Sequence, residues 1–242
     1  MPDGRAAGAD PQLIVALDLP SLEEARRLID LLRPSVQWFK VGLGLFTAAG
    51  LAAVESVHRA GGRVFLDLKL HDIPTTVAAA VSSAAGLGVG MLTLHLAGGE
   101  GMARAAVEAG RQAREAPWLL GVFRLTSDPP AARAGGTWDT LVTTAARAAA
   151  SLRLDGLIAA ASEARLVRST TAPGFLIVSP GVRPVGVSAD DHARTATPAE
   201  TVRAGSDFLV VGRPITRAPD PVAAAQRILE EMRAAMTTAA MQ

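Results

Sequence analysis

Short apolar stretches alternate with amphipathic ones along the whole chain. Residues 13–19 (LIVALDL) are rich in Val, Leu and Ile, which favours a buried strand, and residues 21–33 (SLEEARRLIDLLR) carry apolar positions at helical spacing. This unit of a strand and a helix recurs to the end of the chain, where residues 221–236 are the last predicted helix. The remaining predicted strands cover residues 38–46, 63–70, 91–97, 118–126, 156–161, 174–180 and 208–215.

Eight such units in 242 residues match the size and element count of a closed (β/α)8 TIM barrel of the α/β class. An open, doubly wound parallel sheet is the alternative. The lack of a Gly-x-Gly-x-x-Gly motif after the first strand counts against its dinucleotide-binding version. Because no internal linker divides the sequence, we expect a single barrel domain over residues 1–242, with loose tails at 1–11 and 237–242.

Two long polar segments, residues 127–136 and 183–196, directly follow predicted strands. In a (β/α)8 barrel, the segments that follow strands lie at the C-terminal rim, where active sites of this fold are built. The ends of the strands are therefore the place to look for functional side chains.

Composition narrows the classes of function. Hydrophobic residues make up 49% of the chain and charged residues 19%, which is enough apolar material for a substantial core. A net charge of +1 and an aromatic content of 4% predict no general binding of nucleic acid or of anionic membranes. The absence of cysteine excludes disulfides and thiolate metal sites. With no apolar leader or membrane-length segment in the sequence, we expect a soluble cytoplasmic protein.

One predicted strand, residues 63–70, carries charges at alternate positions. Strand periodicity places Asp67 and Lys69 on the face opposite its three leucines, so the charges point into the barrel if the leucines pack under the helices. An unpaired ion there costs several kcal/mol, so the pair is either a structural salt bridge or part of a functional site. Asp18 and Lys40 fall near the same rim and extend the charges, which favours a functional site.

Glycine and arginine recur together after the seventh and eighth predicted strands, as Gly181 with Arg183 and Gly212 with Arg213. This is where (β/α)8 barrels commonly bind phosphate. Glycine lets backbone N–H groups approach an anion closely, and the arginine fork matches phosphate oxygens. We therefore predict a phosphate-binding site formed by these four residues.

The motif Asp67-x-Lys69-x-x-Asp72, continued as Ile73-Pro74-x-Thr76-Val77, resembles the signature of orotidine 5'-phosphate decarboxylases. Related sugar-phosphate decarboxylases and synthases share Asp-x-Lys-x-x-Asp, but they use magnesium and generally lack the His-Asp-Ile-Pro run. The similarity covers nearly the whole chain, in the segments VALDLP (15–20), FKVGLGLF (39–46), LTS (125–127), SPGVRP (179–184) and VVGRPIT (210–216).

The resemblance implies conversion of orotidine 5'-phosphate (OMP) to UMP and carbon dioxide, without a metal or a cofactor. Asp67 would lie against the substrate carboxylate, while Lys69 would stabilise the C6 carbanion and then protonate it. The resemblance also implies a homodimer in which Asp72, Ile73 and Thr76 complete the active site of the neighbouring subunit. The other implied contacts are Asp18 and Lys40 to the ribose, Arg213 to the 5'-phosphate, Thr126 and Ser127 to the pyrimidine edge, and Pro180 to the base.

Two histidines need separate interpretation. Where the family carries a Gln that reaches the phosphate and the base, this sequence places His192. Its ring has a shorter reach, so both a phosphate contact and a solvent-exposed loop histidine remain open. His95 is predicted to face inward on the fourth strand, and we interpret it as a hydrogen-bonded core histidine.

Two other functions fit parts of the pattern. A magnesium-dependent sugar-phosphate lyase or epimerase on the same barrel requires Asp and Glu ligands that converge on an octahedral ion. A non-catalytic nucleotide-binding sensor requires the phosphate site but not the charges at Asp67 and Lys69.

Overall fold

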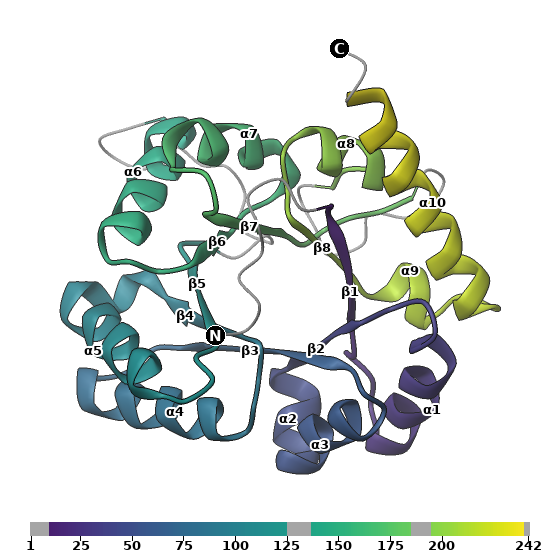
Figure 1. Ribbon diagram of the computed structural model, residues 1–242, viewed down its shortest axis with the longest axis horizontal. Coiled ribbons are helices and arrows are strands. Elements are labelled where there is room, and N and C mark those ends of the chain that lie inside the picture. The colour runs from purple at the N-terminus through teal and green to yellow at the C-terminus, as the bar shows by residue number, and fades with distance from the viewer. Residues whose placement is uncertain (1–9, 125–136, 185–194, 240–242) are drawn as a thin grey trace.

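The computed structural model describes residues 10–124, 137–184 and 195–239, in which eight parallel strands form a closed barrel surrounded by helices (Figure 1). The strands pair in chain order, and β8 pairs back with β1. The strands are β1 (Gln12–Ala16), β2 (Trp38–Gly42), β3 (Arg63–Leu70), β4 (Met91–His95), β5 (Trp118–Val122), β6 (Gly156–Ile158), β7 (Leu176–Ser179) and β8 (Phe208–Val211). The predicted (β/α)8 fold is confirmed, and the open sheet is excluded.

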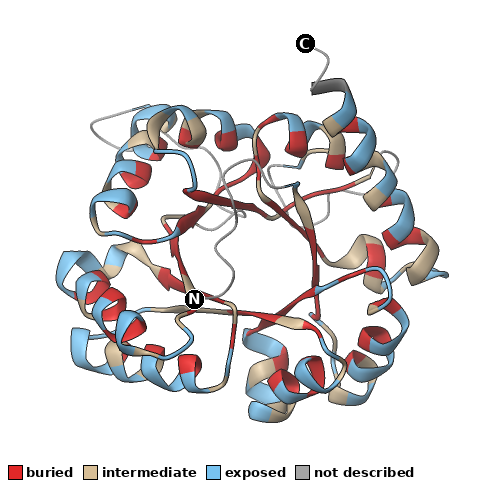
Figure 2. Ribbon diagram, in the orientation of Figure 1, coloured by how far each residue is buried: buried red, intermediate tan, exposed pale blue. Residues whose placement is uncertain are grey.

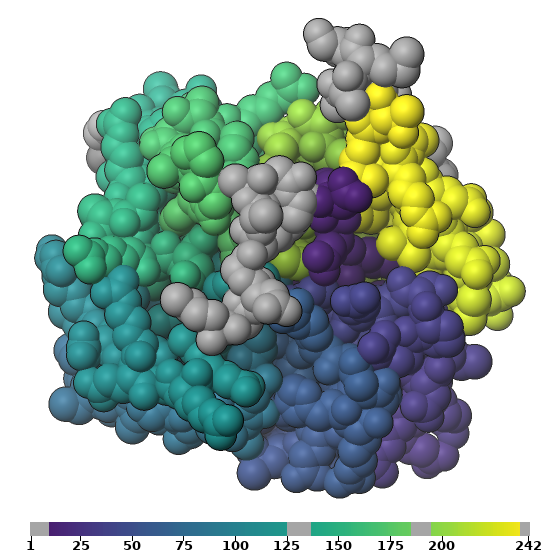
Figure 3. All heavy atoms as spheres, viewed as in Figure 1, coloured from purple at the N-terminus to yellow at the C-terminus, as the bar shows by residue number. Residues whose placement is uncertain are grey.

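Helices follow the strands and cover the outside of the barrel. They are α1 (Leu22–Leu32), α2 (Leu43–Ala49), α3 (Leu51–Arg59), α4 (Pro74–Gly86), α5 (Gly99–Gln112), α6 (Trp138–Ser151), α7 (Ala161–Thr170), α8 (Pro198–Arg203), α9 (Arg213–Thr216) and α10 (Pro221–Ala239), with a short 3-10 turn, η1 (Leu96–Gly98). Figure 3 shows the last helix, α10, beside the early part of the described chain, where it packs against α1 on the barrel wall.

Each predicted strand is present, but most are shorter than the apolar run that predicted them. Residues 43–46, predicted to continue the second strand, instead begin α2, and Leu43 at its start is 56% exposed. In the same way, residues 213–215 of the last predicted strand belong to α9. An apolar run does not by itself distinguish a strand from a helix, which explains both errors.

Aromatic side chains fill the inside of the barrel at its N-terminal end. Trp38, Trp118 and Phe208 are the first residues of their strands, and their ring centroids lie 5.6 to 6.0 Å apart. We call these three residues the aromatic plug. Because it closes one end of the barrel, the space for a ligand lies at the C-terminal ends of the strands.

A second apolar layer lies between the strands and the helices, and Figure 2 shows buried residues along the strands and on the inward faces of the helices. Leu66 is buried in this layer, and Leu68 and Leu70 pack against it. Phe65, by contrast, belongs to the cluster inside the barrel. The predicted alternation of β3 is therefore confirmed, and it directs the charges of this strand inward.

Candidate active site

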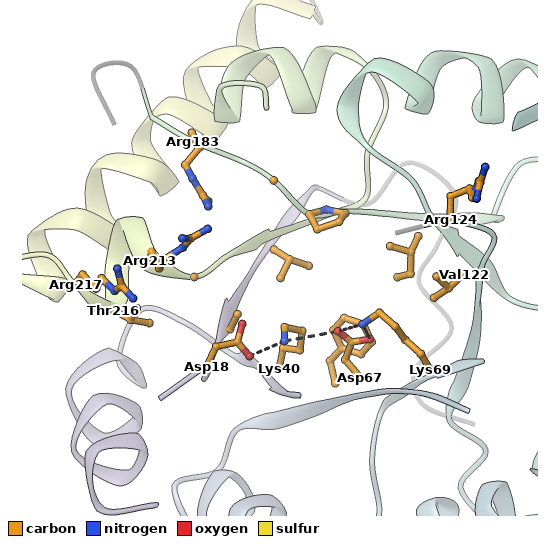
Figure 4. Close-up of a pocket in the computed structure, with 17 residues that line it drawn as sticks. Asp18, Lys40, Asp67, Lys69, Val122, Arg124, Arg183, Arg213, Thr216 and Arg217 are labelled. Atoms are coloured by element: carbon orange, nitrogen blue, oxygen red, sulfur yellow. Dashed lines mark hydrogen bonds and ion pairs between the residues drawn. The ribbon is translucent and has the colours of Figure 1, made fainter. Parts of the chain in front are cut away.

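A cavity of about 530 Å³ opens at the C-terminal ends of the strands. This volume is typical of small-molecule sites. Figure 4 shows its two differently charged sides, with Asp67 and Lys69 on one side and Arg183 and Arg213 on the other. Apolar side chains of the barrel interior complete the wall, namely Ala16, Phe65, Val122, Ile158, Pro180 and Val210.

Four alternating charges from three strand ends form one connected row, which we call the charge array: Asp18, Lys40, Asp67 and Lys69 (Figure 4). Lys40 Nζ lies 2.9 Å from Asp18 Oδ1 and 3.6 Å from Asp67 Oδ2. Lys69 Nζ donates to both Asp67 carboxylate oxygens, at 2.8 and 2.9 Å. The structure thus brings together the four charges that the sequence placed near one rim of the barrel.

Asp67 is ionised at neutral pH although its side chain is only 13% exposed. Burial by itself raises the pKa of this carboxyl, but the charges of Lys40 and Lys69 oppose it, together with hydrogen bonds from Lys69 and Thr93. The net effect lowers the pKa below its usual value. The site therefore holds a fixed negative charge between two ammonium groups.

Thr93 on β4 is a site residue that the sequence did not single out. It is fully buried, its hydroxyl donates to Asp67 Oδ1 at 2.9 Å, and it accepts the backbone N–H of Lys69 at 2.9 Å. The sequence could have indicated Thr93 through strand periodicity, because it lies two residues after Met91 and so shares the inward face of β4 with that residue. Thr93 fixes both members of the Asp67–Lys69 pair.

Lys69 has a left-handed backbone conformation, with φ at +51°. Such a conformation costs a non-glycine residue about 1–2 kcal/mol. The pairing of β3 with β4 shifts register between Leu66 and Leu70, so the irregularity surrounds this residue. Strain of this kind is common at functional sites. Here the strained residue is the one whose ammonium group donates to the Asp67 carboxylate.

The opposite side of the cavity, which we call the arginine end, contains Arg183, Arg213 and Arg217. Gly181 has φ at +78°, a conformation that favours glycine, and both Gly181 and Gly212 line the cavity. The predicted Gly-Arg pairs after β7 and β8 therefore meet at one place. Arg217 also lines the cavity and was missed by the sequence analysis, as was Arg124 at the end of β5.

Gly42, at the end of β2, is a further position that the sequence analysis passed over. A Cβ atom there would lie 2.7 Å from Lys40 Nζ and 2.9 Å from Asp18 Oδ1. The charge array therefore leaves no space for a side chain at this position. Its only sequence signal was its place two residues after Lys40, on the same face of the strand.

Three predicted residues lie outside their own chain's cavity. Asp72, Ile73 and Thr76 are exposed and do not line it. Asp72 Oδ1 accepts the backbone N–H of Ile73 at 2.6 Å, just before α4 begins at Pro74. Three other predicted residues, Thr126, Ser127 and His192, lie outside the described residues.

His95 is not the core histidine that the sequence predicted. It is partly exposed, at the last position of β4, and stacks on the exposed ring of His71 with centroids 5.4 Å apart. Its Nδ1 accepts the backbone N–H of Ala97 at 3.1 Å. The prediction failed because β4 ends at this residue. His95 therefore lies at the rim of the barrel and not in its core.

Two further properties concern metals and membranes. In residues 10–124, 137–184 and 195–239, no group of three or more His, Cys, Asp or Glu side chains is arranged to hold a metal ion. No helix in the same ranges has the length and apolar character needed to cross a membrane.

Known proteins resemble this chain over most of its length. Residues 11–228 match the model of the orotidine 5'-phosphate decarboxylase / HUMPS family. An orotidine 5'-phosphate decarboxylase from Moorella thermoacetica is 48% identical, covering 93% of each chain, and one from Nitratidesulfovibrio vulgaris is 45% identical, covering 92% of this chain and 98% of its own. The crystal structure of the Lactobacillus acidophilus orotidine 5'-phosphate decarboxylase superposes with a TM-score of 0.80 at 34% identity, covering 92% of this chain and 99% of that one.

Proposed function

The chain belongs to the orotidine 5'-phosphate decarboxylase family. We propose that its charge array acts on the pyrimidine ring and the ribose of the substrate, while its arginine end binds the phosphate. The reaction converts OMP to UMP and carbon dioxide in pyrimidine biosynthesis, and the chain catalyses it. The proposal concerns the roles of the residues. It rests above all on the position of a largely buried carboxylate between two ammonium groups, opposite a group of arginines in one cavity.

The orientation of the substrate follows from the charges. The 5'-phosphate is a dianion or close to it at neutral pH, so it belongs at the arginine end, held by Arg213 and Arg183 and by the backbone at Gly212. This places the pyrimidine ring toward Asp67 and Lys69, beside Pro180. Asp18 and Lys40 lie between the two ends and bind the ribose hydroxyls.

The chemical step requires a charge to be stabilised and a proton to be delivered. When the bond from C6 to the carboxylate breaks, carbon dioxide leaves and the electron pair stays on C6. The Lys69 ammonium group stabilises this pair and then transfers a proton to C6, forming the C–H bond of UMP. The neutral Lys69 amine recovers its proton from solvent.

Repulsion between Asp67 and the substrate carboxylate assists the bond cleavage but is too small to explain catalysis. Two unit charges about 4 Å apart interact by roughly 4 kcal/mol at an effective dielectric constant of about 20. Enzymes typically lower the barrier by about 8–23 kcal/mol. The larger part must come from stabilisation of the carbanion by Lys69 and from positioning of the ring through the phosphate.

We also propose a homodimer with shared active sites. Asp72, Ile73 and Thr76 lie outside their own cavity, and a symmetric dimer would bring them to the partner's. Ile73 is 63% exposed, and Leu43, the first residue of α2 directly after the neighbouring strand β2, is exposed as well. Exposed apolar side chains of this kind, near the ends of two neighbouring strands that carry the site, are what a subunit contact would cover. Location in the cytoplasm stays a prediction.

A direct assay tests the proposal. Purified protein in EDTA is mixed with OMP, and the loss of OMP absorbance is followed together with the appearance of UMP. We expect full activity in EDTA. Activity that disappears in EDTA and returns with magnesium would instead support a metal-dependent lyase. Tight UMP binding without any loss of OMP would indicate a nucleotide sensor.

A further inference from the structure

A third arginine lies at the arginine end of the cavity, beside the two that the sequence predicted. Arg217 lines the cavity with Thr216, and Figure 4 shows it on the same side as Arg213 and Arg183, across from Asp67. It belongs to neither of the Gly-Arg pairs. Three guanidinium groups therefore lie at one end of the cavity.

The backbone of α9 sets the direction of Arg217. The residue follows the last residue of this short helix, and its N–H donates to the carbonyl of Arg213 at 3.0 Å. Residues four apart in a helical turn lie on the same face. The two side chains are therefore directed toward the same end of the cavity, one turn apart.

Arg183 and Arg217 differ in burial and in the use of their donors. Arg183 is only 6% exposed, and its Nη1 donates to the carbonyl of Val182 at 3.0 Å. Arg217 is exposed, and no side chain in the described part of the chain forms a hydrogen bond or an ion pair with it. All the donors of the Arg217 guanidinium group are therefore available to a ligand at the rim.

We propose that Arg217 binds the substrate phosphate from the rim of the cavity, as a further substrate-binding residue for decarboxylation. The inference rests on the proposed placement of the phosphate at the arginine end. A phosphate group offers three acceptor oxygens, and each of them accepts more than one hydrogen bond. An oxygen that faces the rim therefore accepts from Arg217 in addition to the contacts at Arg183 and Arg213, and the anion relieves the repulsion among the three arginines.

The expected effect is moderate and confined to binding. Arg217 is exposed, so salt screens its charge, and its long side chain loses rotamer freedom when it binds. We expect its removal to raise the KM for OMP about tenfold, which corresponds to about 1.4 kcal/mol. Because Arg217 lies across the cavity from Lys69, kcat should change by less than about twofold.

Three variants test this role. Arg217→Gln removes the charge at the rim, and Arg217→Lys keeps it. Arg227→Gln makes the same change of charge at an exposed position of α10 that does not line the cavity. The kcat and KM for OMP are measured for each variant at low and at high ionic strength.

We expect Arg217→Gln to raise KM about tenfold and to weaken its dependence on salt, with Arg217→Lys within about threefold of wild type. Arg227→Gln should match wild type. The inference is overturned if Arg217→Gln and Arg227→Gln share the same KM and salt dependence, or if Arg217→Gln lowers kcat with an unchanged KM.

Calorimetric titration with UMP separates this inference from the proposed function. A wild-type protein that leaves OMP unchanged contradicts the proposed function, whatever Arg217 does. The Kd for UMP then still tests the rim contact. A Kd about tenfold weaker for Arg217→Gln than for Arg227→Gln supports it, and equal values overturn it.

Discussion

Lysine is rare in this sequence, and both lysines belong to the charge array. Lys and Arg together number 24, and the only lysines are Lys40 and Lys69. An arginine does not give up its proton under physiological conditions, whereas a lysine ammonium group can donate one to a carbanion. A chain that otherwise carries its positive charge on arginine thus has lysine at the position where proton transfer requires it.

Substitution of Asp67 should remove a contribution to stability that depends on pH in a defined direction. Asp67→Asn leaves two ammonium groups without their shared carboxylate, so we expect a loss of about 1–3 kcal/mol of unfolding free energy at pH 7. The folded-state pKa of Asp67 is lowered, so this contribution is fully present above the usual value of 3.8 and is lost as the pH falls through the lower, folded-state pKa.

Urea unfolding of both proteins between pH 3 and pH 7 measures this dependence. The difference in unfolding free energy between wild type and Asp67→Asn should be constant above about pH 5 and should narrow below about pH 4. A difference that stays constant down to pH 3 would show that the ionised carboxylate of Asp67 does not stabilise the folded protein.

The sequence predicted the members of the charge array better than their exact arrangement. Alternation along β3 was enough to direct Asp67 and Lys69 inward. It could not show that Lys69 has a positive φ, because nothing in the identity of a lysine favours that conformation. Thr93 was missed because a buried threonine has no charge to be explained, and its role appears only when its two hydrogen bonds are seen.

At the scale of elements, the strand starts form a tightly packed floor below the site. Gly90 directly precedes β4, and a Cβ atom there would lie 2.6 Å from a carbon of the Trp38 ring. Gly90→Ala should therefore lower the unfolding free energy by about 1–3 kcal/mol. Gly44, inside α2, has nothing within 4 Å of its Cβ position.

Gly44→Ala is the matched control for Gly90→Ala. Alanine favours a helix over glycine, so this variant should be neutral or more stable by up to about 1 kcal/mol. Denaturant midpoints of the two variants give the comparison. If both substitutions leave the midpoint equally unchanged, the aromatic plug is not as closely packed around Trp38 as the structure indicates.

Strand and helix order was predictable because apolar runs and amphipathic segments alternate regularly. The ends of the elements were harder to predict, as the step from β2 into α2 shows. Gly42, Leu43 and Gly44 continue an apolar run, so the pattern contains no change at the point where the chain turns into a helix. A Cβ atom at Gly42 would meet the side chains of Lys40 and Asp18, a constraint that the apolar pattern does not record.

At the scale of the whole molecule, the shared-site dimer predicts complementation between two inactive variants. Lys69→Ala and Asp72→Ala, each nearly inactive alone, are unfolded together and refolded as mixed dimers. One site of each mixed dimer then receives intact Lys69 from one chain and intact Asp72 from the other, while the second site lacks both. With unbiased pairing, half the dimers are mixed, so activity should recover to about a quarter of wild type.

Material shown to contain mixed dimers but without recovered activity would assign Asp72 to the site of its own chain. Complementation tests only whether the active sites are shared between subunits, because the chemistry of decarboxylation is the same whichever chain supplies Asp72. It therefore distinguishes the arrangement of the subunits from the chemistry of the charge array.

The proton-donating role of Lys69 is the central claim, and the rate of OMP decarboxylation by Lys69→Ala tests it most directly. The variant keeps the arginine end, so UMP should bind with a Kd within a few-fold of wild type, a result that also shows that the protein is folded. Loss of a general acid typically costs about 10²–10⁴-fold, and Lys69 also stabilises the carbanion, so kcat should fall at least a thousandfold. A variant that binds UMP normally and keeps a tenth or more of the wild-type rate would contradict the claim.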